Sequence, residues 1–316
     1  IGAAEGVLRI CKICDVPAVI AVQREATLAS SLIDALCKAG QEDDFIEPKG
    51  ALPIISKRTL CIVVDTYQAG LVESREILEK CGKVAVIDHH RKGVGFIENP
   101  ALVCHEPYSS SASELVTELL QYVGSRDDKP NRVEAEGLLS GIMLDTRDFT
   151  LHTGVRTFEA AAALRRYGAE TERVRQLFDV TMVEYNAKAD LVEKAQMYRS
   201  CAISVSGEVA SEARVAVAQA ANDLLTIQGV DASFVAVQVG SGVNISARSL
   251  GAVNVQVIME SLGGGGHQTM AAAQLKHITP EAAKARIQTA IDEYRESQKK
   301  TLVEAEPEPR KKEKQG

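Results

Sequence analysis

Acidic and histidine side chains follow two apolar stretches of this sequence. Asp65 ends the stretch LCIVVD, and Asp88, His89 and His90 come directly after VAVI. An ionised carboxylate that is buried at a strand end needs a cation or hydrogen-bond donors, because its desolvation is costly. Carboxylate and imidazole ligands together suit Mn, Fe, Co or Zn better than Ca or Mg. The residue types therefore predict a divalent-metal site where the two stretches end.

Asp145 is a further candidate ligand, and its context alone leaves two interpretations open. It stands in GIMLDT, at the end of a pattern with helical apolar spacing. A carboxylate there either joins a metal site or begins a polar loop. Asp-Thr follows an apolar approach both here and at Asp65. A threonine hydroxyl can orient a neighbouring carboxylate through a hydrogen bond.

The elements that must position these residues are two strands and several helices. The Val- and Ile-rich runs at 60–65 and 84–88 are typical of strands that are covered on both faces. The segment between them is long enough for a crossover helix, which favours parallel neighbours. Ligands bind outside the carboxyl ends of such strands. Helical spacing follows over 110–123, 133–145 and 155–166.

The second half of the sequence predicts a smaller α/β domain. Residues 171–198 contain no Pro or Gly and are predicted to be helical. SFVAVQV and VNISARS flank GSG, which indicates a hairpin, and a final helix begins at Pro280. The C-terminal end is charged and poor in apolar residues, so disorder is expected. The predicted organisation is a parallel-sheet α/β domain over 1–182, a helical linker over 183–199, a second α/β domain over 200–297 and a disordered tail over 298–316.

Composition excludes several classes of protein. The net charge of −7 argues against a protein that coats long nucleic acids, because such binding relies on Lys and Arg neutralising phosphates. Seven scattered cysteines do not form a disulfide framework, which favours a reducing, cytoplasmic compartment. No apolar run reaches the roughly 18 residues of a membrane span, so insertion of this chain is not expected.

The motifs VVDT, VIDHH, MLDT and GGGGH, in this order, resemble the DHH superfamily of metal-dependent phosphoesterases with its DHH-associated C-terminal domain. The phrases IDHHRKGVGFIENPALVCHEPYSSSASELVTELL and ISARSLGAVNVQVIMESLGGGGH are similar to one branch, the GdpP-type cyclic-di-AMP phosphodiesterases. The resemblance covers residue 1 to about residue 297. It implies hydrolysis of cyclic-di-AMP to pApA. The alternatives are a nanoRNase or nucleotide phosphatase of the same superfamily, or a noncatalytic nucleotide-binding module.

The resemblance also implies roles for individual residues. Members of this family hold two divalent ions, usually Mn²⁺. Asp65, His89 and Asp145 match metal ligands, and His90 matches a histidine that faces the phosphate. Asp88 is expected to orient an imidazole.

In the DHH-associated domain, the resemblance implies a substrate-binding region. Glycines let backbone N–H groups approach anionic oxygens, although a flexible turn is the alternative. A guanidinium suits phosphate, although a solvated strand residue is again the alternative. Ser109–Ser111 precede a helix and are expected to be simple N-caps. The matching substrate-binding positions are Arg248, Gly263, Gly264, Gly265, Gly266 and His267.

One motif of the family is not in this sequence, which begins at Ile1. It is a His followed by Asp-x-Asp shortly before IGAA, and it normally supplies three metal ligands. With three ligands remaining, this chain is expected to bind metal weakly and to be inactive or nearly so, while its full-length parent is active. The family resemblance further implies a membrane-anchored parent with a cytoplasmic catalytic part. It is compatible with a homodimer, which no pattern here indicates.

Overall fold

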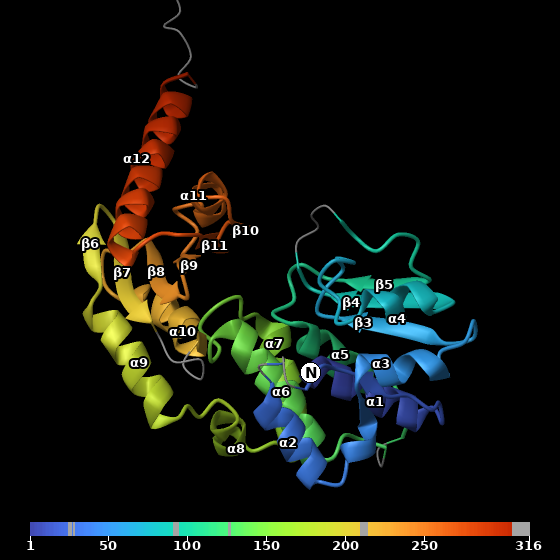
Figure 1. Cartoon of the computed structure of the whole chain (residues 1–316). Coiled ribbons are helices and arrows are strands. Elements are labelled where there is room, and N and C mark those ends of the chain that lie inside the picture. Colours follow the sequence, from blue (N-terminus) through green and yellow to red (C-terminus); the bar gives the residue numbers. More distant parts are fainter. Residues whose placement is uncertain (25–26, 28, 91–94, 126–127, 209–213, 305–316) are drawn as a thin grey trace, which may run out of the picture. The chain divides into compact units, whose positions relative to one another are not determined.

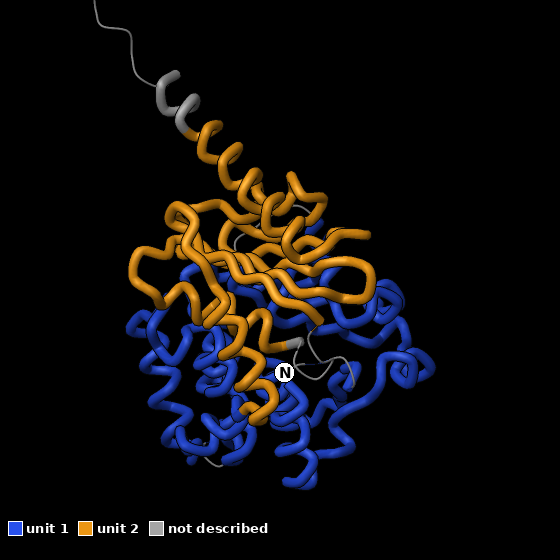
Figure 2. The backbone as a smooth tube through the Cα atoms, turned by 60° about the vertical axis from the view of Figure 1, so that its left-hand side comes forward, with its two compact units in different colours: residues 1–179 blue, residues 180–316 orange. Residues whose placement is uncertain are grey.

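The computed structural model describes residues 1–24, 27, 29–90, 95–125, 128–208 and 214–304. The chain divides into two compact units, residues 1–179 and residues 180–316 (Figure 2). Among the described residues, no helix has both the length and the apolar character of a membrane span.

Unit 1 combines parallel strands with helices (Figure 1). Its elements are α1 (Gly2–Ile13), β1 (Ile20–Ala21), α2 (Ser30–Lys38), η1 (Glu42–Asp44), β2 (Phe45–Ile46), α3 (Pro48–Ala51), η2 (Leu52–Ile54), β3 (Leu60–Val64), α4 (Arg75–Lys80), β4 (Lys83–Asp88), β5 (Leu102–His105), α5 (Ala112–Leu120), α6 (Arg132–Thr146), α7 (Val155–Arg166) and α8 (Thr171–Gln176).

The main sheet of unit 1 has the order β3-β4-β5, and all its neighbours are parallel. The predicted strands and their crossover through α4 are thereby confirmed. In the register of this sheet, Val64 lies beside Ile87, and Asp88 beside His105. The residues that follow β3 and β4 therefore meet at the same edge of the sheet.

Apolar side chains cover both faces of β4. Ile87 belongs to a core built with α1, α5, α6 and α7, whereas Val86 packs on the other face with Val63, Tyr67 and Ile97. Adjacent strand residues point to opposite faces, so a fully buried strand needs an unbroken apolar run. This packing on both faces fixes the strand end from which the Asp88 side chain projects.

Helix α6 lies close against α5 at Gly141. A Cβ built at Gly141 would lie 2.1 Å from Ser113 Oγ and 2.9 Å from Ser113 Cβ. Alanine normally favours a helix interior over glycine by about 1 kcal/mol. Here the overlap with a buried neighbour outweighs that gain.

We expect Gly141→Ala to lower the free energy of unfolding by about 1–3 kcal/mol, the usual cost of overpacking. Urea unfolding measures the change. Gly70→Ala is the control, because a Cβ at Gly70 would meet nothing within 4 Å. Equal stability of Gly141→Ala and the native chain would contradict the tight α5–α6 contact.

Unit 2 contains a larger, mixed sheet with helices on both faces (Figure 1). Its elements are α9 (Met182–Glu193), β6 (Gln196–Tyr198), β7 (Cys201–Glu208), α10 (Arg214–Leu224), β8 (Ala232–Val239), β9 (Gly242–Ser249), α11 (Val255–Ser261), β10 (Gly265–His267), β11 (Met270–Leu275) and α12 (Pro280–Glu304).

The unit 2 sheet has the order β10-β11-β9-β8-β7-β6, with β7 and β8 parallel and the other neighbours antiparallel. Neighbouring residues of β8 point to opposite faces of the sheet and pack into two different hydrophobic cores. Phe234 packs with α11 and α12 residues, while Val235 packs with Leu191 of α9 and with α10. The predicted hairpin is confirmed as β8 and β9, joined at Gly240, whose φ is +57°.

Two predictions about the ends of unit 2 need correction. The helical linker expected over 183–199 is helical only to Glu193, because residues 196–198 form β6 and pair with β7. Leu191 is also buried in the unit 2 core. The tail expected over 298–316 begins as helix, since α12 continues to Glu304 without a Pro or Gly to end it. The rest, 305–316, lies outside the described residues, and the predicted domain boundaries stay predictions.

Candidate metal centre

Asp65 lies directly after β3, at the carboxyl edge of the sheet. Its backbone N–H donates to the carbonyl oxygen of Ile87 at 2.9 Å, so pairing with β4 continues to this residue. Its φ is +66°, in the left-handed region that Asp tolerates better than most non-glycine residues. Such conformations cost roughly 1–3 kcal/mol and persist where the surroundings enforce them. Pairing with β4 thus holds the carboxylate at the strand end.

Asp88 organises the turn that carries the two histidines. Its buried Oδ1 accepts hydrogen bonds from the backbone N–H groups of His89 (2.9 Å) and His90 (3.2 Å) and from His90 Nδ1 (2.7 Å). Burial raises the pKa of Asp88, but the hydrogen bonds from His90 and His89 lower it by more, so Asp88 stays ionised. The prediction that Asp88 orients an imidazole is consistent with these contacts, and the imidazole is that of His90.

The same contact determines the charge of His90. The hydrogen bond to Asp88 raises the pKa of His90 by more than burial lowers it. We therefore expect Asp88→Asn to move the pKa of His90 back toward its ordinary value. An NMR titration of the imidazole C–H signals measures this shift, with the exposed Asp43→Asn as the control. An unchanged pKa in Asp88→Asn would mean that the hydrogen bond does not set the charge of His90.

His89 faces two carboxylates. Its Nε2 lies 3.4 Å from Asp65 Oδ1 and 3.7 Å from Asp145 Oδ2. Its Nδ1 lies 3.3 Å from the carbonyl oxygen of Ser109. Burial lowers the pKa of His89, but the Asp65 and Asp145 carboxylates raise it by more. Three residues far apart in the sequence therefore converge on Nε2.

Asp145 reaches the cluster from the last turn of α6. The helix is followed by three residues with left-handed backbone, Arg147, Asp148 and Phe149. The Thr146 hydroxyl donates to the Ile142 carbonyl at 2.7 Å and accepts from the Phe149 N–H at 2.9 Å. Through these contacts Thr146 holds the backbone of the turn, rather than the carboxylate beside it.

Burial and the charge of Asp65 raise the pKa of Asp145 to about 6, and His89 and His90 lower it by less. Part of this rise in the pKa of Asp145 comes from repulsion between the Asp65 and Asp145 carboxylates, which both face His89 Nε2. A cation between these groups would relieve that repulsion.

The donor atoms fit a divalent cation. One ligand atom from each of Asp65, His89 and His90 lies within 4.8 Å of the others. His89 Nε2 is buried and has no hydrogen-bond partner. A buried polar atom without a partner costs free energy unless something binds it. In the tautomer with Nδ1–H directed at the Ser109 carbonyl, the Nε2 lone pair would face Asp65 and Asp145. A metal ion there would take the place of the proton that the two carboxylates favour on Nε2.

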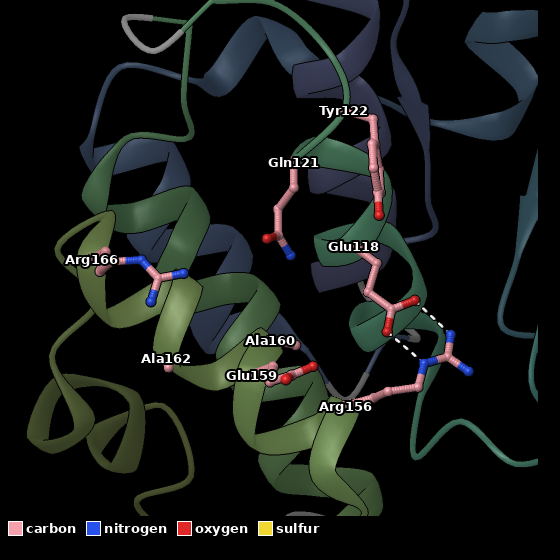
Figure 3. Close-up of a pocket in the computed structure, with 8 residues that line it drawn as sticks. All are labelled: Glu118, Gln121, Tyr122, Arg156, Glu159, Ala160, Ala162 and Arg166. Atoms are coloured by element: carbon pink, nitrogen blue, oxygen red, sulfur yellow. Dashed lines mark hydrogen bonds and ion pairs between the residues drawn. The ribbon is translucent and has the colours of Figure 1, made fainter.

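A separate hollow of about 700 Å³ lies between α5 and α7 (Figure 3). Across it, Arg156 makes two hydrogen bonds to Glu118, at 2.7 and 2.6 Å. None of the cluster residues lines this hollow. Its lining residues are Glu118, Gln121, Tyr122, Arg156, Glu159, Ala160, Ala162 and Arg166.

Two family models match the chain on either side of the unit boundary. The DHH family N-terminal domain matches residues 9–142, and the DHHA1 domain matches residues 205–297. The chain has a DHH domain followed by a DHHA1 domain. Asp65, Asp88, His89 and His90 lie within the DHH match, and Asp145 lies just beyond it.

Curated relatives match most of the chain. The cyclic-di-AMP phosphodiesterase GdpP of Geobacillus thermodenitrificans is 45% identical over 306 residues, which is 95% of this chain and 46% of the relative. The protein of the same name from Bacillus subtilis is 42% identical over 302 residues, which is 93% of this chain and 46% of the relative. The chain therefore spans about half the length of the curated relatives it matches.

A solved structure has a similar fold. An exopolyphosphatase-related protein from Bacteroides fragilis aligns with a TM-score of 0.78, covering 93% of this chain and 88% of that chain. The sequence identity is 19%, so the likeness concerns the fold alone. The predicted α/β fold class is confirmed.

The predicted substrate-binding residues lie in the DHHA1 domain. Arg248 is near the end of β9, opposite Met270 of β11, and its guanidinium donates to Ser246 Oγ and to the Ala247 carbonyl. His267 ends β10 and is exposed. His267 directly follows the glycine run, whereas β11 lies between the strand of Arg248 and β10. The binding roles of both residues stay predictions.

The glycine run has a packing reason as well as a predicted binding role. A Cβ at Gly264 would lie 2.1 Å from the Ala272 carbonyl oxygen, and one at Gly266 would lie 2.4 Å from Ala271 Cα. Gly263 has φ +80° and Gly265 meets nothing within 4 Å. Close pairing of β10 with β11 therefore requires glycine at 264 and 266, while a Cβ at 263 or 265 would meet no other atom within 4 Å.

Sequence reasoning missed the loop beside His89. Ser111 is the N-cap of α5, as predicted, because its hydroxyl accepts the Glu114 N–H at 3.0 Å. Ser109 and Ser110 are not simple caps, since their hydroxyls donate to the Glu114 carboxylate. The only signal in the sequence is a run of serines shortly before an acid.

Proposed function

We propose that this chain is the catalytic part of a metal-dependent phosphodiesterase that hydrolyses cyclic-di-AMP to the linear dinucleotide pApA. The observation that carries the proposal is the convergence of Asp65, Asp145 and the partnerless Nε2 of His89. The substrate is proposed from the 45% identity to GdpP over 95% of the chain.

Asp65, His89 and Asp145 would hold the metal, for which we propose a pair of Mn²⁺ ions. Bound divalent ions of this kind activate water and neutralise charge that develops on a phosphoryl group. Asp88 accepts His90 Nδ1–H, which directs His90 Nε2 away from Asp88. In the protonated ring, Nε2–H is then available to donate to a phosphoryl oxygen. In this proposal, Asp88 fixes both the orientation and the charge of His90.

In the DHHA1 domain, we propose that Arg248, His267 and the glycines at 263–266 bind the dinucleotide. A guanidinium is a suitable donor for phosphate oxygens, and glycines let a phosphate approach the backbone closely. The N–H groups of Gly263 and Gly264 already donate to the carbonyls of Glu260 and Met259, so in this proposal these two glycines give access rather than donors. The membrane-anchored parent, the cytoplasmic location and the homodimer remain predictions from the family resemblance.

The test compares the products and rates of this chain, with added Mn²⁺, on cyclic-di-AMP, pApA and short RNA. Because only three metal ligands are present, we expect slow turnover by this chain, fastest on cyclic-di-AMP and with pApA as the product; fast turnover would contradict the expected near-inactivity. A strong preference for short RNA would instead indicate a nanoRNase. Binding of cyclic-di-AMP without metal and without cleavage would indicate a noncatalytic nucleotide-binding module.

A further inference from the structure

The Ser109 carbonyl contacts His89 on the side away from the carboxylates. It lies 3.3 Å from His89 Nδ1. A carbonyl oxygen can only accept a hydrogen bond, so the contact favours the neutral tautomer with its proton on Nδ1. That tautomer presents the Nε2 lone pair to the space between Asp65 and Asp145. The Ser109 carbonyl thus favours a proton on Nδ1, against Asp65 and Asp145, which favour one on Nε2, and so it biases His89 toward the form whose Nε2 can bind metal.

Glu114 of α5 holds the loop that carries this carbonyl. Ser109 Oγ donates to Glu114 Oε1 at 2.8 Å. Ser110 donates to Glu114 Oε2 through its N–H at 3.2 Å and its hydroxyl at 2.5 Å. The Thr157 side chain of α7 also hydrogen-bonds to this carboxylate. Four donors from two segments therefore converge on one buried acid.

This arrangement exceeds what helix capping needs. The Ser111 hydroxyl already accepts the Glu114 N–H, so the Glu114 carboxylate is not required for the cap. Burial raises the pKa of Glu114, but hydrogen bonds from Ser110, Thr157 and Ser109 lower it by more. A buried ionised carboxylate in this position keeps the Ser109–Ser110 backbone in one conformation.

We propose that Glu114 and Ser109 are positioning residues that fix the tautomer and the orientation of the His89 imidazole for metal binding. The inference rests on the proposed function, in which His89 is a metal ligand. Metal-bound histidines usually have their second ring nitrogen hydrogen-bonded, and loss of such outer partners typically weakens metal binding 10–100-fold. Here the outer partner of His89 is the Ser109 carbonyl, and Glu114 in turn holds the loop that carries this carbonyl.

The test compares Ser109→Ala and Glu114→Gln with Ser111→Ala. Ser109→Ala removes the hydrogen bond from Ser109 to Glu114 Oε1 and leaves the two from Ser110, whereas Glu114→Gln removes the charge that all three donors face. Ser111→Ala removes the helix cap and leaves all three hydrogen bonds, so it controls for loss of stability. The ¹⁵N NMR shifts of His89 report its tautomer in the metal-free full chain, at a pH above the pKa of His89. Comparison with His89→Gln assigns the signals.

We expect the native chain and Ser111→Ala to carry a larger share of the neutral-ring proton on Nδ1 than the other two variants do. Ser109→Ala and Glu114→Gln should populate the Nε2–H tautomer and bind Mn²⁺ roughly 10-fold more weakly. A native tautomer in both of these variants, or an equal change in Ser111→Ala, would overturn the proposal. Ser109→Ala retains the carboxylate and decides the question if Glu114→Gln does not fold.

The tautomer measurement also separates this inference from the proposed function. It uses metal-free protein and needs no substrate. If the native chain bound neither Mn²⁺ nor cyclic-di-AMP, the proposed function would fail, whereas the comparison of Ser109→Ala with Ser111→Ala would still decide whether the loop sets the His89 ring.

Discussion

His89→Gln is expected to weaken Mn²⁺ binding on the order of 100-fold or more, because a direct ligand should matter at least as much as its outer partners. The imidazole nitrogen that faces Asp65 and Asp145 is lost. Glutamine keeps a polar group of comparable length but offers an amide in place of a basic nitrogen. Two carboxylates then face each other without the imidazole between them.

The Mn²⁺ affinity is measured by titrating the metal-free chain with Mn²⁺. Calorimetry or the magnetic resonance signal of the metal is the readout. Any turnover of cyclic-di-AMP that the chain shows should fall in parallel. The control is His277→Asn, which replaces an exposed histidine of unit 2. His277 has a φ of +53°, and asparagine tolerates this left-handed conformation. A native Mn²⁺ affinity in His89→Gln would show that His89 is not a metal ligand. The proposed metal site between Asp65, His89 and Asp145 would then be wrong.

The strands that carry this site were predictable because their burial leaves a direct trace in the sequence. Val86 and Ile87 face different cores, so the run at 84–88 has to be continuously apolar. Parallel pairing then places the ends of β3 and β4 at one edge. Helix α6 brings Asp145 to the same edge. Helical periodicity alone did not decide whether Asp145 joins a metal site or begins a polar loop.

The remaining differences arise where tertiary contacts decide the structure. Residues 196–198 have no strong strand signal, and they become a strand because β7 offers a free edge for pairing. The contact of the Ser109 carbonyl with His89 involves a backbone atom, which every residue has and no motif records. The left-handed backbone of Asp65 likewise follows from its neighbours rather than from its identity.

Glu5→Gln is expected to change how the stability of unit 1 depends on pH. Glu5 is fully buried in α1, and its Oε2 has no hydrogen-bond partner. Burial, with the charges of Glu134 and Asp44, raises its pKa to about 7. The nearby cations are already engaged: Arg9 pairs with Glu134, and Lys12 pairs with Asp44.

The sign of the effect follows from the direction of the shift. The folded state holds the Glu5 proton more tightly than the unfolded state, whose pKa is near the ordinary value of 4.5. The stabilisation is therefore fully present below about pH 4.5 and is lost as the pH rises through about 7. Between pH 5 and pH 8 this linkage amounts to about 2 kcal/mol.

Urea unfolding at both pH values tests this expectation. The native chain should lose about 2 kcal/mol more stability than Glu5→Gln on going from pH 5 to pH 8, because glutamine has no proton to lose. Glu79→Gln, at an exposed acid, should follow the native chain. Equal losses in the native chain and Glu5→Gln would require that ionised Glu5 finds a compensating positive charge. Arg9 and Lys12 are already paired with Glu134 and Asp44, so one of these ion pairs would have to rearrange to supply that charge. Gln41, whose side-chain N–H now donates to the Glu5 carboxylate at 2.7 Å, would then have to release it.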